Sequence, residues 1–479
     1  MKILFVGSEV MPFAATGGLG DVLGSLPQAL AKTDEKDDIR VVMPLYGTIG
    51  AEHRKKMKFE KAFDVMLAWR KLYCGVFSLK QNGVTYYFLD NEYYFKRDSL
   101  YGSFDDGERY AYFCAAVLRM MYEVDFYPDI LHANDWQSAL SVVYLNLKYR
   151  YIEPYSKIRT VFTIHNIQYQ GQYDFAILGD VFDIENKDRG YVDYGGCVNL
   201  MKGAVELCDR VTTVSPTYAR EILSPEYAHG LSELLQRHSG KLSGILNGID
   251  YVYYDPKTDP DIVSDYSWRS IGKKTPNKTA LQKQYGLTED EMIPLYCMIT
   301  RLADHKGLDL VKYMLEDFVA NHNVQFVVLG KGERDYEDYF RYLAAKYPNK
   351  VAALLIYDRA LSKKVYAAAD MFVMPSKSEP CGLSQMIALR YGAVPITRET
   401  GGLYDSIKGY YRDEQGKICG NGFTFRNYNA DELRDRMQAA YDLYNDKAVW
   451  QKFVRKIMRE DFSWEKSAQE YQALYHELA

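Results

Sequence analysis

Short, continuous apolar runs alternate along the chain with stretches of helical spacing, and this alternation limits the folds available to it. In the first half the apolar runs are KILFVGS (2–8), DIRVVMPLY (38–46), DILHAND (129–135), RTVFTIHN (159–166) and DRVTTVSP (209–216). Helical spacing follows the first run in 17–32 and the third run in 136–150. Strands that are apolar along their whole length are buried on both faces, so the pattern predicts a parallel sheet with helices on both sides.

The alternation restarts in the second half of the chain, after about residue 250. The runs there are IPLYCMITR (293–301), VQFVVLGKGE (324–333), VAALLIYD (351–358), DMFVMPS (370–376) and AVPIT (393–397). A chain of 479 residues is also too long for one ordinary core. We therefore predict an α/β protein with two doubly wound, Rossmann-like parallel-sheet domains that face each other across a cleft.

The segment 247–267 is rich in Asp, Pro and Tyr and lacks periodicity, which is typical of a connection between domains. We place the first domain at 1–245 and the second at 246–458. The last residues, 459–479, contain the amphipathic stretch SWEKSAQEYQALYHEL. We expect them to form a helix that packs back on the first domain.

Composition excludes several classes of protein. The formal net charge is −5, whereas a dedicated nucleic-acid binder is usually basic. The apolar run at the start is too short for a signal peptide, and no segment approaches the ~20 apolar residues that span a bilayer. Seven widely spaced cysteines do not form a disulfide framework, so we expect a reducing, cytoplasmic location. The abundance of tyrosine, at 43 residues, is either a feature of composition alone or reflects exposed rings that stack on sugars.

A glycine pair, Gly17-Gly18, opens the first helical stretch three residues before Asp21. Glycine lets a backbone approach a ligand closely, and a helix N-terminus favours phosphate. The alternative is a plain tight turn, and the spacing matches neither GxGxxG nor a P-loop. The string Thr16-Gly17-Gly18-Leu19 returns as Thr400-Gly401-Gly402-Leu403, again between a strand and a helix. Both strings lie at the carboxyl ends of predicted strands, where doubly wound sheets bind ligands.

Two basic residues, Arg301 and Lys306, follow the first strand of the second set. Together they can hold a diphosphate and neutralise charge on a leaving group. The alternative is a solvated surface pair.

Glu379 precedes Pro380, Cys381 and Gly382, where a helix of small residues starts. A carboxylate beside an anion-binding helix start needs a different partner, and sugar hydroxyls donate well to carboxylates. This combination predicts a sugar phosphate or a nucleotide sugar as ligand.

The first half supplies further polar residues at strand ends, namely Asp135, His165 and Asn166. One histidine at a strand end is more often structural, but several such residues at strand ends favour a binding cleft. His132 with Asp135 is too little for a metal site, and the chain contains neither HExxH nor GxSxG.

These residues belong to a longer set of motifs that occur in order along nearly the whole chain. The set is SEVMPF, TGGLGDV, HANDWQSAL, FTIHNIQYQG, TVSPTYA, GILNGID, NKTALQ, TRLADHKGLDL, SEPCGLSQMIALRYGAVPI, TGGLYDSI, GNGFTF and DFSW. With them the chain resembles bacterial glycogen synthases and plant starch synthases, which are retaining glucosyltransferases of GT-B architecture. The resemblance implies transfer of glucose from ADP-glucose to the non-reducing end of an α-1,4-glucan, with release of ADP.

The resemblance also implies roles for individual residues. The family's contacts to the nucleotide sugar correspond to Gly17, Gly18, Arg301, Lys306, Tyr357, Cys381, Gly382, Leu383, Thr400 and Gly401. Tyr357 corresponds to the aromatic residue that contacts the adenine. Its catalytic set corresponds to Asp21, Asp135, His165, Arg301, Lys306 and Glu379. Asp135, Asn166 and Asn247 correspond to the glucose and acceptor side, which falls in the first domain, whereas the donor side falls in the second.

In the implied reaction, Arg301 and Lys306 stabilise the charge that grows on the departing β-phosphate. The phosphate accepts the proton of the acceptor hydroxyl, so no side-chain nucleophile is needed. We expect no metal and no pyridoxal phosphate, no membrane or nucleic-acid partner, and allow for a homo-oligomer. A glucan phosphorylase would need a lysine for pyridoxal phosphate, and residues 381–391 contain none.

One position departs from the family pattern. The motif Lys-x-Gly-Gly has its lysine where this chain has Ala15. Either the remaining cations suffice, or catalysis or donor preference is altered. A catalytically silent glucan-binding homologue is the alternative function, although Asp135, His165 and Glu379 are all present.

Overall fold

The computed structural model describes residues 1–479, which divide into two compact units. Unit 1 comprises Met1–Gly248 and Trp464–Ala479, and unit 2 comprises Ile249–Ser463. The chain therefore crosses between units after Gly248 and after Ser463, close to the boundaries that the sequence suggests. The predicted connection 247–267 differs, because almost all of it belongs to unit 2, where the Tyr266 hydroxyl donates to the Tyr391 carbonyl at 2.7 Å.

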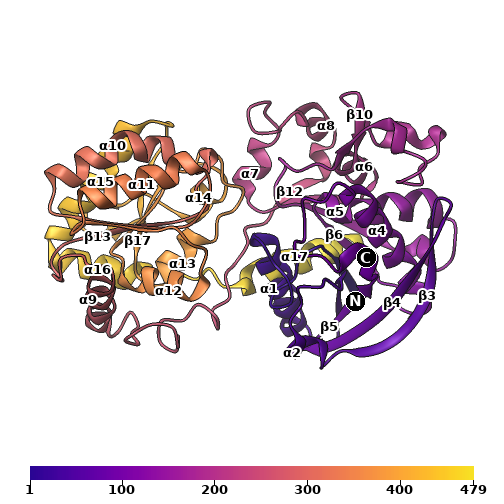
Figure 1. Cartoon of the computed structure of the whole chain (residues 1–479), viewed down its shortest axis with the longest axis horizontal. Coiled ribbons are helices and arrows are strands. Elements are labelled where there is room, and N and C mark those ends of the chain that lie inside the picture. The colour runs from indigo at the N-terminus through magenta and orange to yellow at the C-terminus, as the bar shows by residue number, and fades with distance from the viewer. The chain divides into compact units, whose positions relative to one another are not determined.

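Unit 1 is built on a nine-stranded sheet with the order β12-β11-β7-β6-β1-β2-β5-β4-β3 (Figure 1). Seven of its strands run parallel: β1 (Lys2–Val6), β2 (Asp38–Pro44), β5 (Val84–Asp90), β6 (Ile130–Asn134), β7 (Arg159–Ile164), β11 (Arg210–Thr213) and β12 (Leu242–Gly244). The five apolar runs of the first half all form strands, and β6 is buried along its whole length. This part of the prediction is confirmed.

Two antiparallel strands at the edge of this sheet were not predicted. They are β3 (Lys58–Leu67) and β4 (Arg70–Gln81), and β4 pairs antiparallel with both β3 and β5. Most of β3 is exposed, so its sequence has no continuous apolar run. The sheet is therefore mixed rather than purely parallel.

Helices cover both faces of the unit 1 sheet (Figure 1). They are α1 (Gly18–Thr33), α2 (Ala51–Arg54), α3 (Glu92–Phe95), α4 (Asp106–Glu123), α5 (Trp136–Tyr144), α6 (Leu200–Leu207), α7 (Pro216–Glu221), α8 (Ser232–Arg237) and α17 (Trp464–Leu478). A small antiparallel sheet is formed by β8 (Gln172–Tyr173), β10 (Cys197–Asn199) and β9 (Asp193–Tyr194).

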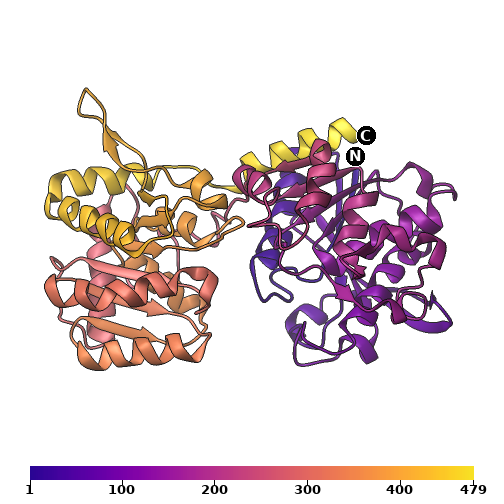
Figure 2. The ribbon, with the colours of Figure 1, turned by 90° about the horizontal axis from the view of Figure 1, so that it is seen from above.

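The C-terminal helix α17 is part of unit 1 and packs beside α1. A buried chain of hydrogen bonds joins it to the sheet. Tyr475 bonds His132 Nδ1 at 2.7 Å, His132 Nε2 bonds Thr163 at 2.5 Å, and Thr163 bonds Thr212 at 2.5 Å. Figure 2 shows that this places the two chain ends side by side.

Unit 2 contains a six-stranded, fully parallel sheet with the order β15-β14-β13-β16-β17-β20. Its strands are β13 (Leu295–Ile299), β14 (Gln325–Leu329), β15 (Val351–Leu354), β16 (Met371–Met374), β17 (Val394–Arg398) and β20 (Phe423–Phe425). Counted along the chain this is the order 3-2-1-4-5-6 of a dinucleotide-binding fold. All five apolar runs of the second half form strands, as predicted.

Helices cover both faces of this sheet as well (Figure 1). They are α9 (Thr275–Gln284), α10 (Leu308–Asn321), α11 (Arg334–Lys346), α12 (Arg359–Ala368), α13 (Ser384–Arg390), α14 (Gly401–Ser406), α15 (Ala430–Asn445) and α16 (Lys447–Ile457). A two-stranded hairpin of β18 (Tyr411–Arg412) and β19 (Ile418–Cys419) extends from the unit.

Each sheet has one point where the strand order reverses. In unit 1 this switch point lies between β1 and β6, and in unit 2 it lies between β13 and β16. Loops at the carboxyl ends of strands diverge there and leave room for a ligand. Candidate residues of the sequence follow β1, β6, β13 and β16, so both switch points carry residues that were predicted to bind a ligand.

Candidate functional site

The glycine loop of unit 1 lies at the start of α1, with Gly17 as its N-cap residue. A Cβ atom added to either Gly17 or Gly18 would meet nothing within 4 Å, so this backbone borders open space. The first amides of a helix lack intrahelical acceptors and can bind an anion. Asp21 is half-buried in the same first turn. The geometry therefore fits the predicted approach of a phosphate.

The sequence did not predict a role for Glu9, which organises this loop. Glu9 is 4% exposed and follows β1. Its carboxylate accepts hydrogen bonds from the Thr16 amide at 2.6 Å, the Gly17 amide at 3.1 Å and the Thr16 hydroxyl at 2.7 Å. Two amides of the loop are thus already occupied, which leaves the amides of α1 itself for a ligand.

Asp135 joins the ends of β6 and β7. Its Oδ1 accepts hydrogen bonds from the amides of His165 at 2.8 Å and Asn166 at 3.4 Å. Its backbone has φ 57° and ψ 177°, a conformation that residues other than glycine rarely adopt. Burial raises the pKa of Asp135 to about 7, although the two amides act in the opposite direction. This carboxyl group can therefore hold or release a proton near neutral pH.

His165 is held beside Asp135 as a neutral imidazole. Burial lowers the pKa of His165 to about 3. Its Nε2 lies 2.9 Å from Asn134 Oδ1, while the amide group of Asn134 donates to the carbonyls of Val6 and His132. Nε2 is therefore the donor, and Nδ1 remains an acceptor for a hydroxyl group.

Two asparagines of unit 1 complete the predicted acceptor side. Asn166 Oδ1 accepts from the Gln168 amide at 3.0 Å, which leaves the side-chain amino group of Asn166 for other partners. Asn247 is 5% exposed, and its Oδ1 has no hydrogen-bond partner in the protein. A buried polar atom without a partner is costly, so it fits a position that a ligand completes.

In unit 2, the loops after β13 and β16 meet at the switch point. Lys306 Nζ lies 2.6 Å from Glu379 Oε2, which also accepts from the Ser376 hydroxyl at 3.0 Å. Gly307 has φ 74°, and a Cβ there would lie 2.2 Å from the Pro375 carbonyl oxygen. The structure therefore brings two of the predicted site residues, Lys306 and Glu379, into direct contact, and their role in binding remains a prediction.

Arg301 lies at the same edge and is exposed. Arg301, Lys306 and Glu379 all act electrostatically on His305, so the two cations and the carboxylate lie around that side chain. A diphosphate could bind the guanidinium and share Lys306, whose ammonium group has further donors beside the one given to Glu379.

The second glycine pair differs from the first in what surrounds it. A Cβ on Gly401 would lie 2.0 Å from the Glu379 carbonyl oxygen, and one on Gly402 would lie 2.0 Å from that of Cys381. The Gly402 amide donates to the Glu379 carbonyl at 3.1 Å. These glycines therefore let two backbones touch, whereas Gly17 and Gly18 border open space.

This contact supports the residues predicted to bind the nucleotide sugar. Cys381 is 5% exposed and Thr400 is fully buried, while Gly382 has φ 69° and Leu383 is the N-cap residue of α13. Gly382 and Leu383 are partly exposed, whereas Cys381, Thr400 and Gly401 are buried. Roles for Thr400 and Gly401 in binding remain predictions.

Tyr357 follows β15 at the same carboxyl edge as Arg301. Its ring is 72% exposed, and its hydroxyl accepts from Arg359 Nε at 3.1 Å. A ring this exposed is available for stacking on a flat ligand. It lies two strands from β13 in the sheet order.

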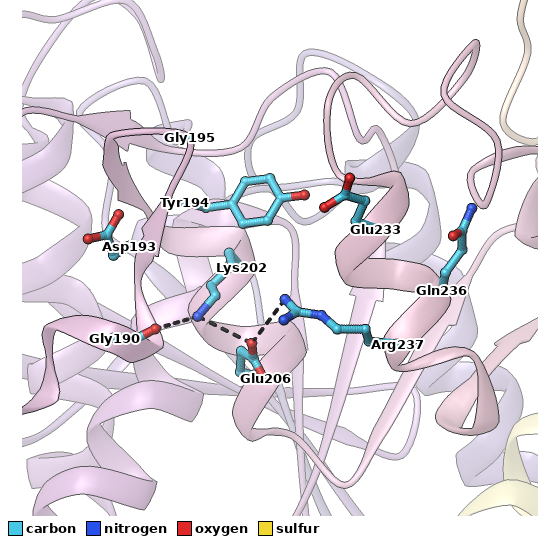
Figure 3. A pocket seen from close by; sticks show the side chains of 9 residues that line it. All are labelled: Gly190, Asp193, Tyr194, Gly195, Lys202, Glu206, Glu233, Gln236 and Arg237. Atoms are coloured by element: carbon cyan, nitrogen blue, oxygen red, sulfur yellow. Dashed lines mark hydrogen bonds and ion pairs between the residues drawn. The ribbon is translucent and has the colours of Figure 1, made fainter.

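Unit 1 also has a polar pocket of about 660 Å³ that the sequence did not predict (Figure 3). It is lined by Gly190, Asp193, Tyr194, Gly195, Lys202, Glu206, Glu233, Gln236 and Arg237. Figure 3 shows Lys202 and Arg237 reaching toward Glu206 from two helices. The distances to the Glu206 carboxylate are 3.2 Å for Lys202, 3.7 Å for Arg237 and 2.8 Å for His238. Burial alone would raise the pKa of Glu206, but Lys202 and His238 outweigh it and lower the pKa.

Both halves of the chain match known protein families. A family profile for the starch synthase catalytic domain matches residues 2–237, and one for glycosyl transferases group 1 matches residues 278–457. The glycogen synthase of Clostridium beijerinckii is 48% identical over 481 residues, covering 100% of this chain and 99% of its own. The chain belongs to the glycogen synthase family. The glycogen synthase of Anoxybacillus flavithermus is 46% identical over 480 residues, covering 100% of this chain and 98% of its own.

As a member of the glycogen synthase family, the chain is a glucosyltransferase. The catalytic domain of starch synthase IV from Arabidopsis thaliana, bound to ADP and acarbose, matches with a TM-score of 0.90 at 33% identity and covers 99% of each chain. The predicted GT-B fold class is confirmed. None of the helices combines the length and apolar character needed to cross a membrane.

Proposed function

We propose that the chain transfers glucose from ADP-glucose to the non-reducing end of an α-1,4-glucan, with retention of configuration and release of ADP. The observation that carries the proposal is the Lys306–Glu379 ion pair at the switch point of a dinucleotide-type sheet, with Arg301 on the same loop after β13. Support for the donor comes from the starch synthase relative, which was solved with ADP. Its second ligand, acarbose, supports a glucan as acceptor.

In this proposal the residues of unit 2 bind the donor. The guanidinium of Arg301 and the ammonium of Lys306 bind the diphosphate, and Tyr357 stacks on the adenine. As the bond between the anomeric carbon and the β-phosphate oxygen breaks, negative charge grows on that oxygen. Two cations placed there beforehand stabilise it without reorganisation, and such stabilisation is often the largest catalytic term.

Glu379 and the polar residues of unit 1 act on the sugars. The Glu379 carboxylate, which is 7% exposed, accepts from glucose hydroxyls while keeping Lys306 in place. Asp135, His165 Nδ1, Asn166 and Asn247 are hydrogen-bonding groups for glucose and for the acceptor, and Asp21 lies at the helix start that approaches the diphosphate.

Proton transfer needs no side-chain nucleophile in this scheme. The departing phosphate takes the proton of the attacking acceptor hydroxyl, which adds from the same face of the sugar. We further propose that the reaction needs no metal, because Arg301 and Lys306 supply the positive charge, and no pyridoxal phosphate, because residues 381–391 contain no lysine to hold it. Full activity after treatment with EDTA is expected, and loss that added divalent cation restores would contradict this.

A donor comparison tests the proposed function. The protein is incubated with glycogen and either ADP-glucose or UDP-glucose, and nucleotide release is measured. We expect release of ADP to depend on glycogen and to exceed release of UDP. A faster reaction with UDP-glucose would overturn the donor assignment, and glycogen binding without any release would indicate the silent glucan-binding alternative. Resistance of the newly added units to an α-1,4-specific glucosidase would contradict retention.

A further inference from the structure

A second cavity, of about 230 Å³, lies inside unit 2. It is lined by residues of α9, α15 and α16, of the segment before α9, and of the segments before β13, β16 and β17, among them Lys274, Lys278, Glu291, Asp370, Tyr444 and Lys447. Asp370 directly precedes β16, and its carboxylate accepts from the Leu295 amide at the first residue of β13, at 2.9 Å. The cavity is therefore at the amino edge of the sheet, opposite Arg301, Lys306 and Glu379.

Three lysines line this cavity. Lys274 is 8% exposed and donates to the carbonyls of Tyr366 and Ala367 at 3.2 and 2.7 Å. Lys278 is 3% exposed and donates to Asp370 Oδ2 at 2.7 Å and to the Tyr444 hydroxyl at 3.0 Å.

Lys447 is half-buried at the start of α16, and its Nζ lies 3.1 Å from the centre of the Tyr444 ring. Lys278 Nζ lies 5.3 Å from the same ring centre, so two ammonium groups lie near one aromatic ring. Lys278 lowers the pKa of Lys447, because like charges near each other raise each other's energy unless an anion intervenes.

The negative charges at the cavity do not balance these cations. Asp370 bonds Lys278, while Lys274 is held by two neutral carbonyls. Glu291, the other lining acid, is exposed, and its backbone carbonyl rather than its carboxylate accepts a hydrogen bond from Lys278, at 2.9 Å. Burial and the neighbouring Lys278 lower the pKa of Lys274 to about 7 and that of Lys447 to about 8.

We propose that this cavity binds a compact oxyanion, either inorganic phosphate or a small phosphate monoester, between Lys274, Lys278 and Lys447. Lys447 makes no hydrogen bond within the protein and Lys274 has one donor left, so these two supply charge-assisted donors for such an anion. Lys278 contributes its charge, because its three donors go to the Glu291 carbonyl, Asp370 and Tyr444. The volume lies below the range of about 300–1,000 Å³ typical of sites for larger ligands, so a nucleotide does not fit. The site is separate from the proposed donor site and does not depend on the proposed function.

Binding should be linked to proton uptake. The charged groups that act on Lys447 are Asp370, Lys278, Asp290 and Glu291, and those that act on Lys274 are Asp370 and Lys278. The Cys297 thiol near Lys274 is neutral, because burial raises its pKa. An added anion favours the charged form of both lysines and raises their pKa values. The affinity of the cavity for the anion is therefore highest below about pH 7, where both lysines are protonated before the anion binds. The affinity falls as pH rises through about 8.

Calorimetric titration of the full chain tests this with three probes: sulfate, inorganic phosphate and glycerol 3-phosphate. Sulfate keeps its charge between pH 6 and 9, so its pH dependence reports the protein alone. The titrations are made with Arg301→Gln as background, because an anion could also bind at the proposed donor site. Lys447→Gln is the test variant, and Lys452→Gln, an exposed lysine of the same helix that does not line the cavity, is the control.

We expect saturable binding that Lys447→Gln weakens by roughly 10-fold or more and that Lys452→Gln leaves unchanged. Sulfate affinity should fall from pH 7 to pH 9 with uptake of protons. Tighter binding of glycerol 3-phosphate than of phosphate would identify a monoester as the ligand, and the reverse order would identify the free anion. Absence of saturable binding by all three probes, or equal weakening by both lysine variants, would overturn the proposal.

Discussion

At the scale of single residues, the candidate site depends on groups whose protonation the fold has set. His165 is kept neutral and Asp135 is kept close to its titration point, both because they are buried. The sequence identified both residues from their places at strand ends, but not their charge states, because those depend on neighbours far away in the chain. Glu9 was missed for the same reason, since its partners become visible only when the loop is folded.

Replacement of Asp135 by Asn should remove a pH dependence of stability. The pKa of Asp135 is raised from 3.8 to about 7 in the folded protein, so the folded state holds this proton more tightly than the unfolded state does. That stabilisation is complete below about pH 4 and is lost as pH rises through about 7. We expect the free energy of unfolding of Asp135→Asn to fall less than that of the parent between pH 4 and pH 7.5. Denaturant titrations at both pH values measure this, and parallel curves would contradict it.

Ala15→Lys should alter catalysis or donor affinity. Ala15 is half-buried next to Glu9 and Gly20, at the loop where the helix start faces open space. A charged hydrogen bond to a diphosphate there corresponds to roughly 10- to 100-fold in rate if it acts on the transition state. Steady-state kinetics with ADP-glucose and UDP-glucose are the measurement. Identical kcat and KM values for both proteins would show that position 15 does not reach the donor.

At the scale of elements, continuous apolar runs predicted the central strands of both sheets, because those strands are buried on both faces. The edge strands β3 and β4 escaped prediction since one side of them is exposed and their sequences mix polar with apolar residues. The two glycine pairs show a further limit. Their sequences are nearly the same, yet one borders open space and the other lies against backbone, and only the fold distinguishes them.

The contrast between the glycine pairs can be measured with matched substitutions. Gly402→Ala would force a Cβ against the Cys381 carbonyl, which lies 2.0 Å away, so we expect a loss of about 1–3 kcal/mol of stability. Gly18→Ala, at the equivalent position of the other pair, should change stability by less than about 0.5 kcal/mol, because nothing lies within 4 Å. Thermal unfolding of both variants tests this. Equal effects would mean that the close approach at Gly402 is easily relaxed.

At the scale of the whole molecule, unit 1 contains both ends of the chain, residues 1–248 and 464–479. Helix α17 closes that unit through the buried bonds of Tyr475 and His132. The sequence placed the domain boundaries within a few residues and expected the last helix on the first domain. It could not place the polar pocket of Figure 3 or the lysine cavity, because segments distant in sequence line each of them.

Tyr475→Phe should destabilise unit 1. The substitution leaves His132 Nδ1 buried without a partner, at a cost of about 1–3 kcal/mol. Tyr313→Phe, at a tyrosine that is 74% exposed, is the control and should have little effect. Hydrogen exchange resolved by peptide measures the loss of protection, which we expect in the sheet of unit 1 and not in unit 2. Equal protection in parent and variant would show that this hydrogen bond contributes nothing to the docking of α17.

The central claim is that Arg301 and Lys306 neutralise the diphosphate as it departs, and the double variant Arg301→Gln/Lys306→Gln tests it most directly. The measurement is kcat/KM for glucosyl transfer from ADP-glucose to glycogen, with circular dichroism to confirm folding. We expect a fall of at least about 100-fold, as for removal of preorganised charge stabilisation in other enzymes. Transfer at the parental rate by the folded double variant would contradict the account.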